Sequence, residues 1–191
     1  MKLRTVESVL DIPADQWNAC ANPSGFNPFV SHEFFKALED SGSATGRTGW
    51  KAEHLVYETA KGDIAGIAPC FIKPHSQGEY VFDHGWAEAY HRAGGRYYPK
   101  LQSSVPFTPV TGPRLFSASA ETRALLAKGL VSVCKELKAS SAHITFLPEA
   151  DWVVADKAHW LQRQDIQFHW QNAGYTSFDD FLASLSSSKR K

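Results

Sequence analysis

The sequence predicts one mixed α/β domain with a partly antiparallel central sheet flanked by helices. Apolar residues recur at helical spacing in some segments and alternate or run continuously in others. These segments follow one another in the order strand, two helices, hairpin, irregular segment, long helix, strand, helix, strand. A chain of 191 residues can bury a core of its own without disulfides or metals. We find no internal repeat and no low-complexity linker that would divide this series.

The beginning of the chain predicts a short strand over residues 3–6 and two helices. Pro13 suits the first position of a helix over residues 13–19. Ser31 is a good N-cap for the second helix, and Glu33 lies in its first turn, where a negative charge is favourable.

A hairpin is predicted next. Residues 51–59 form one strand, residues 61–63 form a turn, and residues 64–72 are almost continuously apolar, which is typical of a strand buried on both faces. Pro69 cannot donate a ladder hydrogen bond, so we expect a bulge or a sheet edge at this position.

The second half predicts helices that alternate with strands. Four prolines make residues 97–116 irregular, because each fixes φ and removes a donor. The expected elements are helices over residues 86–93 and 120–138, the latter capped by Ser119, a strand over residues 143–147 and a helix that opens at Pro148.

Residues 165–172 alternate between apolar and polar side chains and predict a strand. Ser177 and Asp180 then form the start of a further helix, as in a capping box. We therefore expect a lobe over residues 1–176 and, over residues 177–191, the start of a helix that links to a missing second lobe.

Composition argues against several classes of protein. The formal net charge is +0, whereas nucleic-acid-binding proteins usually carry a basic surplus. The three cysteines form no CxxC pair, which disfavours a disulfide scaffold or zinc ribbon. No apolar segment reaches the roughly 20 residues that span a bilayer, and no signal peptide is evident. These observations predict a cytoplasmic protein with no membrane span.

Metal and acid–base chemistry have a few candidates. His84, Glu88 and His91 share one face of a predicted helix and could hold a metal, but a di-iron site needs a second Glu-x-x-His motif. An exposed face is the better interpretation, and we expect no metal. Asp83 and His169 are the candidate catalytic residues for proton transfer, although a solvated strand face is the commoner setting for a residue such as His169.

The proline-rich segment 97–114 is the strongest candidate for ligand binding. Its prolines stiffen the chain before a ligand arrives, which lowers the ordering cost of binding. It combines cations, hydroxyls and flat apolar faces, a mixture that suits a phosphate-bearing or acyl ligand. The alternative is a rigid connection whose aromatic rings fill the core. The predicted substrate-binding residues are Tyr98, Lys100, Thr108, Thr111 and Arg114.

Several stretches resemble a known bacterial family. They include residues 27–32, 78–83, 90–94, 97–101, 106–115, 167–170 and 178–182. The resemblance extends from about Asn27 to the end of the chain and is to the FemAB-like peptidoglycan biosynthesis/recognition family.

This resemblance implies a fold and a function. The family resembles the Fem aminoacyl transferases, which have two GNAT-like lobes and add amino acids to peptidoglycan precursors from aminoacyl-tRNA. Family members are longer than this chain, so the resemblance implies one GNAT-like N-terminal lobe. Residues 92–97 depart from the Q/R-x-x-G-x-G/A turn by which GNAT acetyltransferases bind coenzyme A, because Tyr97 occupies its last position.

We therefore expect an N-acyl or aminoacyl transferase lobe that acts on cell-envelope precursors. Its acyl donor would be aminoacyl-tRNA or acetyl-CoA, and its substrate a small molecule or an envelope precursor. Two alternatives stay open: a non-catalytic recognition module, and a self-sufficient acetyl-CoA-dependent N-acetyltransferase.

Overall fold

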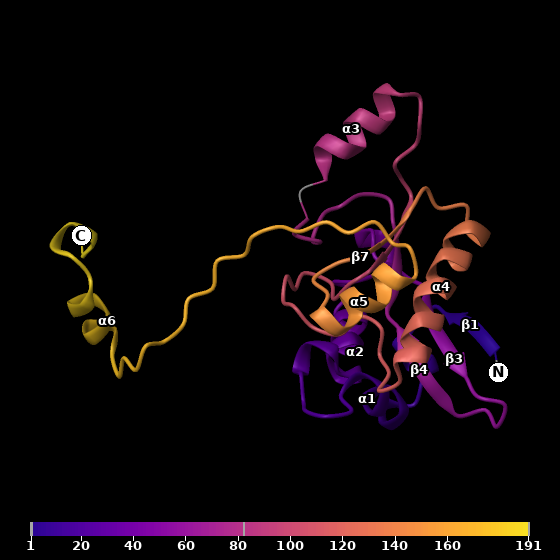
Figure 1. Cartoon of the computed structure of the whole chain (residues 1–191), viewed down its shortest axis with the longest axis horizontal. Helices are drawn as coiled ribbons and strands as arrows, with labels where there is room; N and C mark the ends of the chain where they lie inside the picture. Colours follow the sequence, from indigo (N-terminus) through magenta and orange to yellow (C-terminus); the bar gives the residue numbers. More distant parts are fainter. Residues whose placement is uncertain (1, 82, 191) are drawn as a thin grey trace. The chain divides into compact units, whose positions relative to one another are not determined.

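The computed structural model describes residues 2–81 and 83–190. The chain forms two compact units, Met1–Leu161 and Gln162–Lys191 (Figure 1). Among the described residues, the first unit contains both sheets and five α-helices, and the second unit contains one short α-helix. The predicted fold class, a mixed α/β fold with a partly antiparallel sheet, is confirmed. The predicted division into residues 1–176 and 177–191 stays a prediction.

The strands of the first unit form two small sheets. The first is antiparallel throughout and has the order β1-β3-β4, with β1 at Lys2–Val6, β3 at His54–Glu58 and β4 at Ile64–Ala68. The second has the order β2-β5-β6-β7, with β2 at Lys51–Ala52, β5 at Cys70–Lys73, β6 at Lys100–Ser103 and β7 at Ala142–Ile144. Only β6 and β7 are parallel among these described pairs.

One hairpin supplies strands to both sheets. Each of its arms is interrupted once, at Glu53 in the first arm and at Pro69 in the second. The Glu53 amide donates to the Cys70 carbonyl oxygen at 2.9 Å across the interruption. The two arms keep the same register on both sides of the interruption, since Leu55 pairs with Ala68 and Ala52 pairs with Phe71. The predicted hairpin is confirmed. Of the two alternatives expected at Pro69, the edge is found, because Pro69 follows β4 at the edge of the first sheet. The bulge is not found there, because the register shifts between Tyr57 and Glu58 instead.

The helices that follow Ser31 and Ser119 begin where the sequence predicts, whereas the helix predicted over residues 86–93 begins earlier, at His84. The Ser31 hydroxyl accepts from the Phe34 amide at 3.3 Å, and the Ser119 hydroxyl accepts from the Thr122 amide at 3.2 Å. The helices of the first unit are α1 (Ala14–Ala21), α2 (His32–Asp40), α3 (His84–Arg92), α4 (Ala120–Glu136) and α5 (Glu149–Lys157).

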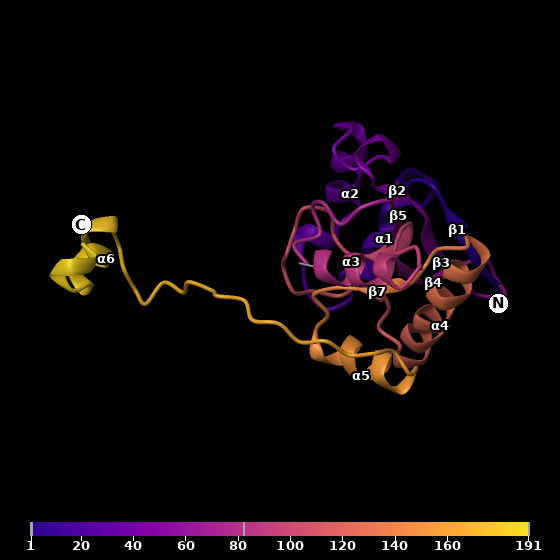
Figure 2. The same ribbon diagram turned by 90° about the horizontal axis from the view of Figure 1, so that it is seen from above.

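Strand β3 has a core on each of its faces, because successive side chains point to opposite sides of a sheet. Val56 lies in a cluster with Trp17 of α1 and Phe35 of α2. Leu55 lies in a second cluster with Leu126 and other residues of α4. Helix α4 packs against β3 and β4, which Figure 2 shows from above. The sheet is thus covered on both sides, as the fold class requires.

Two predictions about strands need correction. The four prolines of residues 97–116 predict an irregular segment, but residues 100–103 of it form strand β6, which pairs with β5 and β7. The strand predicted over residues 165–172 is wrong: no described residue of this segment belongs to a strand. Its apolar side chains are exposed, with Phe168 at 96%. Alternation predicts which side chains share a face, but it does not supply the partner strand that completes the backbone hydrogen bonds.

The second unit contains helix α6 at Phe178–Ser184. The Ser177 hydroxyl accepts from the Asp180 amide at 3.1 Å, so the predicted helix start is confirmed.

Candidate functional site

A buried ionic network surrounds Lys100, the first residue of β6. Its Nζ atom donates to Glu79 Oε2 at 2.7 Å, to Asp83 Oδ2 at 2.6 Å and to Ser76 Oγ at 2.8 Å. All four side chains are buried, and Lys100 is only 1% exposed. A buried charge is tolerated when it is paired and hydrogen-bonded, and Lys100 meets both conditions.

Lys73 brings a second cation to this network. It is the register partner of Lys100 across β5 and β6, and it is buried. Its Nζ atom lies 3.4 Å from the ring centroid of Trp50 and donates to the Gln77 carbonyl oxygen at 3.1 Å. Burial lowers the pKa of Lys73 to about 8, although Glu79 opposes this shift. Two lysines thus face two carboxylates in the interior.

The two carboxylates respond differently to this environment. Burial raises the pKa of Glu79 above its usual value, and the charge of Lys100 only partly offsets this. Burial would also raise the pKa of Asp83, but hydrogen bonds from Lys100 and Ser76 outweigh it and hold the pKa below its usual value. Asp83 is therefore the firmly ionised partner of Lys100.

Two consecutive tyrosines connect this network to the surface. The Tyr97 hydroxyl donates to Asp83 Oδ2 at 2.9 Å, and the Tyr98 hydroxyl lies 2.8 Å from Ser76 Oγ. Burial and the neighbouring Asp83 carboxylate raise the pKa of Tyr97, so its phenol stays neutral. Both rings are consequently held in place by groups beneath them.

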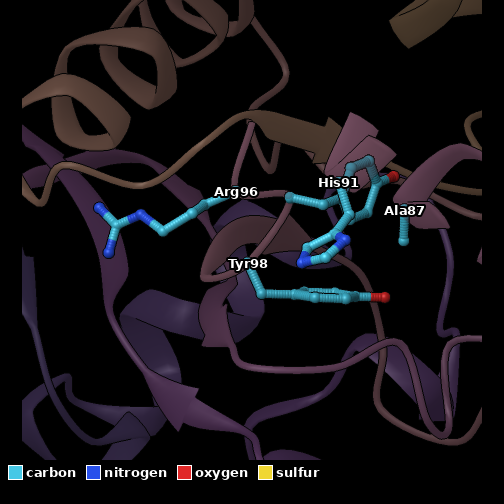
Figure 3. Close-up of a pocket in the computed structure, with 5 residues that line it drawn as sticks. Ala87, His91, Arg96 and Tyr98 are labelled. Atoms are coloured by element: carbon cyan, nitrogen blue, oxygen red, sulfur yellow. The ribbon is translucent and has the colours of Figure 1, made fainter. Parts of the chain in front are cut away.

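A pocket of about 350 Å³ lies over these tyrosines. It is lined by Ala87 and His91 of α3 and by Arg96, Tyr97 and Tyr98 (Figure 3). The His91 imidazole and the Tyr98 ring face the same space, whereas the Arg96 side chain extends away from it. Small-molecule sites usually have a volume of roughly 300–1,000 Å³ and are lined by aromatic and other apolar side chains with a few polar groups. The pocket can stack a flat group on a ring and offer hydrogen bonds from an imidazole.

The structure brings three of the predicted site residues together. Asp83, Tyr98 and Lys100 belong to the network and its pocket. Thr108 instead donates to the Pro106 carbonyl oxygen at 3.0 Å, and Thr111 is exposed. His169 lies in the second unit, where its Nε2 atom is 3.1 Å from Gln167 Oε1. The functional roles of these residues stay predictions.

Arg114 is buried but turned back onto its own loop. Its Nη1 atom donates to the carbonyl oxygens of Gly112 and Pro113, both at 3.0 Å, and Nη2 donates to that of Val110 at 2.7 Å. Asp151 accepts from the backbone amides of Arg114 and Leu115 at 3.0 and 3.2 Å. The guanidinium therefore stabilises the proline-rich loop, and Arg114 is only 1% exposed.

Sequence reasoning missed Ser76, Glu79, Tyr97 and His91 as members of the site. Only the pairing of β5 with β6 brings Ser76 and Glu79 to Lys100, and no local pattern indicates it. The sequence offers His91 as a metal ligand together with His84 and Glu88. Within residues 2–81 and 83–190 no three His, Cys, Asp or Glu side chains gather in a group that could hold a metal. Glu88 instead forms an ion pair with Arg92 at 3.4 Å.

His143 of β7 should make stability depend on pH. Its Nε2 atom is 2.7 Å from Ser141 Oγ, and burial, with a contribution from Lys100, lowers its pKa to about 4 from a usual value of 6.5. Between these values the unfolded chain binds more protons than the folded chain, so stability falls as the pH drops from about 6.5 to about 4. Urea unfolding at several pH values should show a shallower fall for His143→Gln than for the unsubstituted chain. An unchanged slope in the variant would contradict this.

Comparison with known proteins gives one family match. The profile of a family described as FemAB-like, peptidoglycan biosynthesis/recognition, matches residues 8–191. Curated protein sequences give no significant match. None of the helices in the described residues is long and apolar enough to cross a membrane.

Solved structures that are similar to this chain have low sequence identity. Aminoglycoside 6'-N-acetyltransferase AAC(6')-Ih from Acinetobacter baumannii is 10% identical with a TM-score of 0.47, over 91% of this chain and 99% of that one. The BH1408 protein from Bacillus halodurans, as a tetramutant, is 11% identical with a TM-score of 0.47, over 89% and 100%. TTHA1254 from Thermus thermophilus is 15% identical with a TM-score of 0.44, over 92% and 99%.

Proposed function

The chain belongs to the FemAB-like family, and we propose from this premise that the unit Met1–Leu161 is an acyl- or aminoacyl-transferase-like lobe that binds an envelope-precursor substrate. The proposed binding site is the pocket between α3 and the Tyr97–Tyr98 pair. The observation that carries this proposal is the anchoring of both tyrosines from below by Asp83 and Ser76. Rings held in this way need no ordering when a ligand arrives, which favours binding.

Each residue has a proposed part in this site. His91 and Tyr98 face the pocket and would contact the substrate directly. Asp83 is buried and bonded to Lys100, so it would act through Tyr97 as a positioning residue. In transfer to an amine, positioning of the amine against the activated carbonyl supplies much of the rate, and a protein nucleophile is unnecessary.

The loop after α3 argues against coenzyme A as the donor at this place. A pyrophosphate is best bound by free amides at a helix N-terminus. The amides of Ala93, Gly94 and Gly95 follow the C-terminal end of α3 and donate to the carbonyl oxygens of Ala89, His91 and Tyr90, respectively. We therefore propose that an aminoacyl donor is the better candidate and that it binds outside this loop.

Calorimetric titration with a soluble, nucleotide-linked muropeptide precursor tests this function. We expect measurable binding that weakens at least about tenfold in Tyr98→Ala and in His91→Ala, because each removes a wall of the pocket. His84→Ala is the matched control: it lies on the same helix, does not line the pocket and should keep the affinity within about twofold.

Three results would change the interpretation. Equal affinity in all variants would exclude the pocket as the binding site. Binding that is accompanied by no transfer from any donor would indicate a recognition module. Tight binding of acetyl-CoA by the chain alone would favour a self-sufficient N-acetyltransferase.

A further inference from the structure

The pocket over the two tyrosines presents flat ring faces and few hydrogen-bonding groups. The Tyr97 hydroxyl is bonded to Asp83 Oδ2 at 2.9 Å, and the Tyr98 hydroxyl lies 2.8 Å from Ser76 Oγ. Both hydroxyls are therefore engaged beneath the pocket. Among the five residues that line it, His91 brings the polar group that faces the same space as the Tyr98 ring (Figure 3).

An arginine without a partner lies at the edge of this pocket. Arg96 lines the pocket, and its exposed side chain extends outward from it (Figure 3). Gly95 lets the loop pass close to Tyr90 at this point, because a β-carbon at Gly95 would lie 2.5 Å from that ring. Within the described part of the chain Arg96 forms no ion pair, whereas Arg92 is paired with Glu88 at 3.4 Å. The Arg96 guanidinium is therefore available to an anion.

Two ring faces beside an available arginine suit a flat group that carries a negative charge. A sugar has hydroxyls all around its ring, and it would lose hydrogen bonds to water in a pocket with so few polar groups. A nucleobase loses less, because it can stack on aromatic side chains with both of its faces. Arginine in turn binds phosphate through two parallel hydrogen bonds.

We propose that this pocket binds a nucleoside diphosphate. The base lies between the His91 imidazole and the Tyr98 ring, and the diphosphate meets Arg96 at the edge. This assignment rests on the proposed function and deepens it, because a nucleotide-linked precursor would be held by its nucleotide end rather than by its peptide. The pocket then anchors the substrate, and the transfer takes place outside the pocket.

The same chemistry could come from two sources. One is a precursor that carries uridine diphosphate (UDP), and the other is the adenosine diphosphate (ADP) portion of coenzyme A. The precursor is the better candidate, because the amides of Gly94 and Gly95, which could bind a pyrophosphate, are bonded to carbonyl oxygens of α3.

Calorimetric titration of the whole chain with UDP, ADP and uridine tests the proposal. We expect UDP to bind, and Arg96→Ala to weaken its binding at least about fivefold, since a charge-assisted contact to phosphate is lost. Uridine has no phosphate, so its affinity should stay within about twofold in the same variant. Arg92→Ala is the matched control: it removes an exposed arginine of α3 that does not line the pocket, and it should leave UDP binding unchanged.

Two variants of Tyr98 test the base-binding part of the site. Tyr98→Leu should weaken both UDP and uridine about tenfold, because the stacking face is lost. Tyr98→Phe keeps the ring and loses only the contact with Ser76, so it should weaken both ligands less than Tyr98→Leu does. Arg96→Ala also covers the case in which Tyr98→Leu fails to fold, because Arg96 is exposed.

Competition with the complete precursor separates this proposal from the proposed function. UDP should displace the precursor, whereas a muramyl peptide without a nucleotide should not. Failure of both nucleotides to bind, or nucleotide binding that is equal in Arg96→Ala and Tyr98→Leu, would overturn the nucleotide site. Precursor binding that depends on Tyr98 and His91 but is displaced only by the muramyl peptide would also overturn it, and would leave the proposed function standing. Tighter binding of ADP than of UDP would keep the nucleotide site and assign it to coenzyme A.

Discussion

Replacing Lys100 with alanine should lower the free energy of unfolding by about 3–5 kcal/mol, because it leaves buried carboxylates without their cation. Lys100 is bonded to Glu79 and Asp83 at 2.7 and 2.6 Å, and neither carboxylate can reach bulk water without a change in the fold. Urea unfolding followed by circular dichroism measures the loss. We expect the Tyr97 and Tyr98 rings to lose their fixed positions as well, since Asp83 and Ser76 anchor them.

Lys36→Ala is the control for this substitution. Lys36 is also paired with a carboxylate, that of Asp40, but both side chains are about half exposed. The loss there should be below about 1 kcal/mol. A second variant separates charge from packing: Lys100→Met combined with Glu79→Gln and Asp83→Asn should recover part of the stability, because neither carboxylate is then charged and Lys73, whose pKa burial already lowers, is the cation of the network that is left. If Lys100→Ala proves as mild as Lys36→Ala, the network does not hold the site together.

Replacing Arg114 with alanine should cost about 3 kcal/mol or more, because three carbonyl oxygens lose a buried donor. The proline-rich loop should then become susceptible to proteases, and limited proteolysis with mass spectrometry would locate the cuts between β6 and α4. Arg92→Ala, at an exposed arginine paired with Glu88, should change stability by less than about 0.5 kcal/mol.

This substitution also separates two roles for the loop. A structural role requires that Arg114→Ala lose stability in the absence of any ligand. If the variant is as stable as the unsubstituted chain but no longer binds the precursor, Arg114 belongs to a ligand cradle, as the sequence suggested.

Local signals in the sequence predicted most of the first unit. Ser31 and Ser119 mark helix starts because a cap is a contact between neighbours in the chain. Pro69 marks the interruption of a strand because a missing amide is a property of that residue alone. Strand β6 was missed and residues 165–172 were wrongly assigned because strand formation depends on distant partners, which no local pattern contains.

The site could be predicted only in part for the same reason. Because Lys100 and Arg114 lie in one short segment of the sequence, both are predicted to bind the same ligand. In the structure Lys100 enters a strand and reaches Asp83, whereas Arg114 bonds to its own loop. The pocket depends on His91 of α3 lying over Tyr98, an arrangement set by the path of the chain between them.

The hairpin that runs through both sheets makes the turn at residues 61–63 unusually consequential. The pairing already shifts by one residue between Tyr57 and Glu58, beside this turn, while the rest of both arms keeps its register. A change in the length of the turn that this irregularity cannot absorb would slide one arm past the other on both sides of Pro69. Side chains that now fill the interior would then be presented to solvent in two sheets at once.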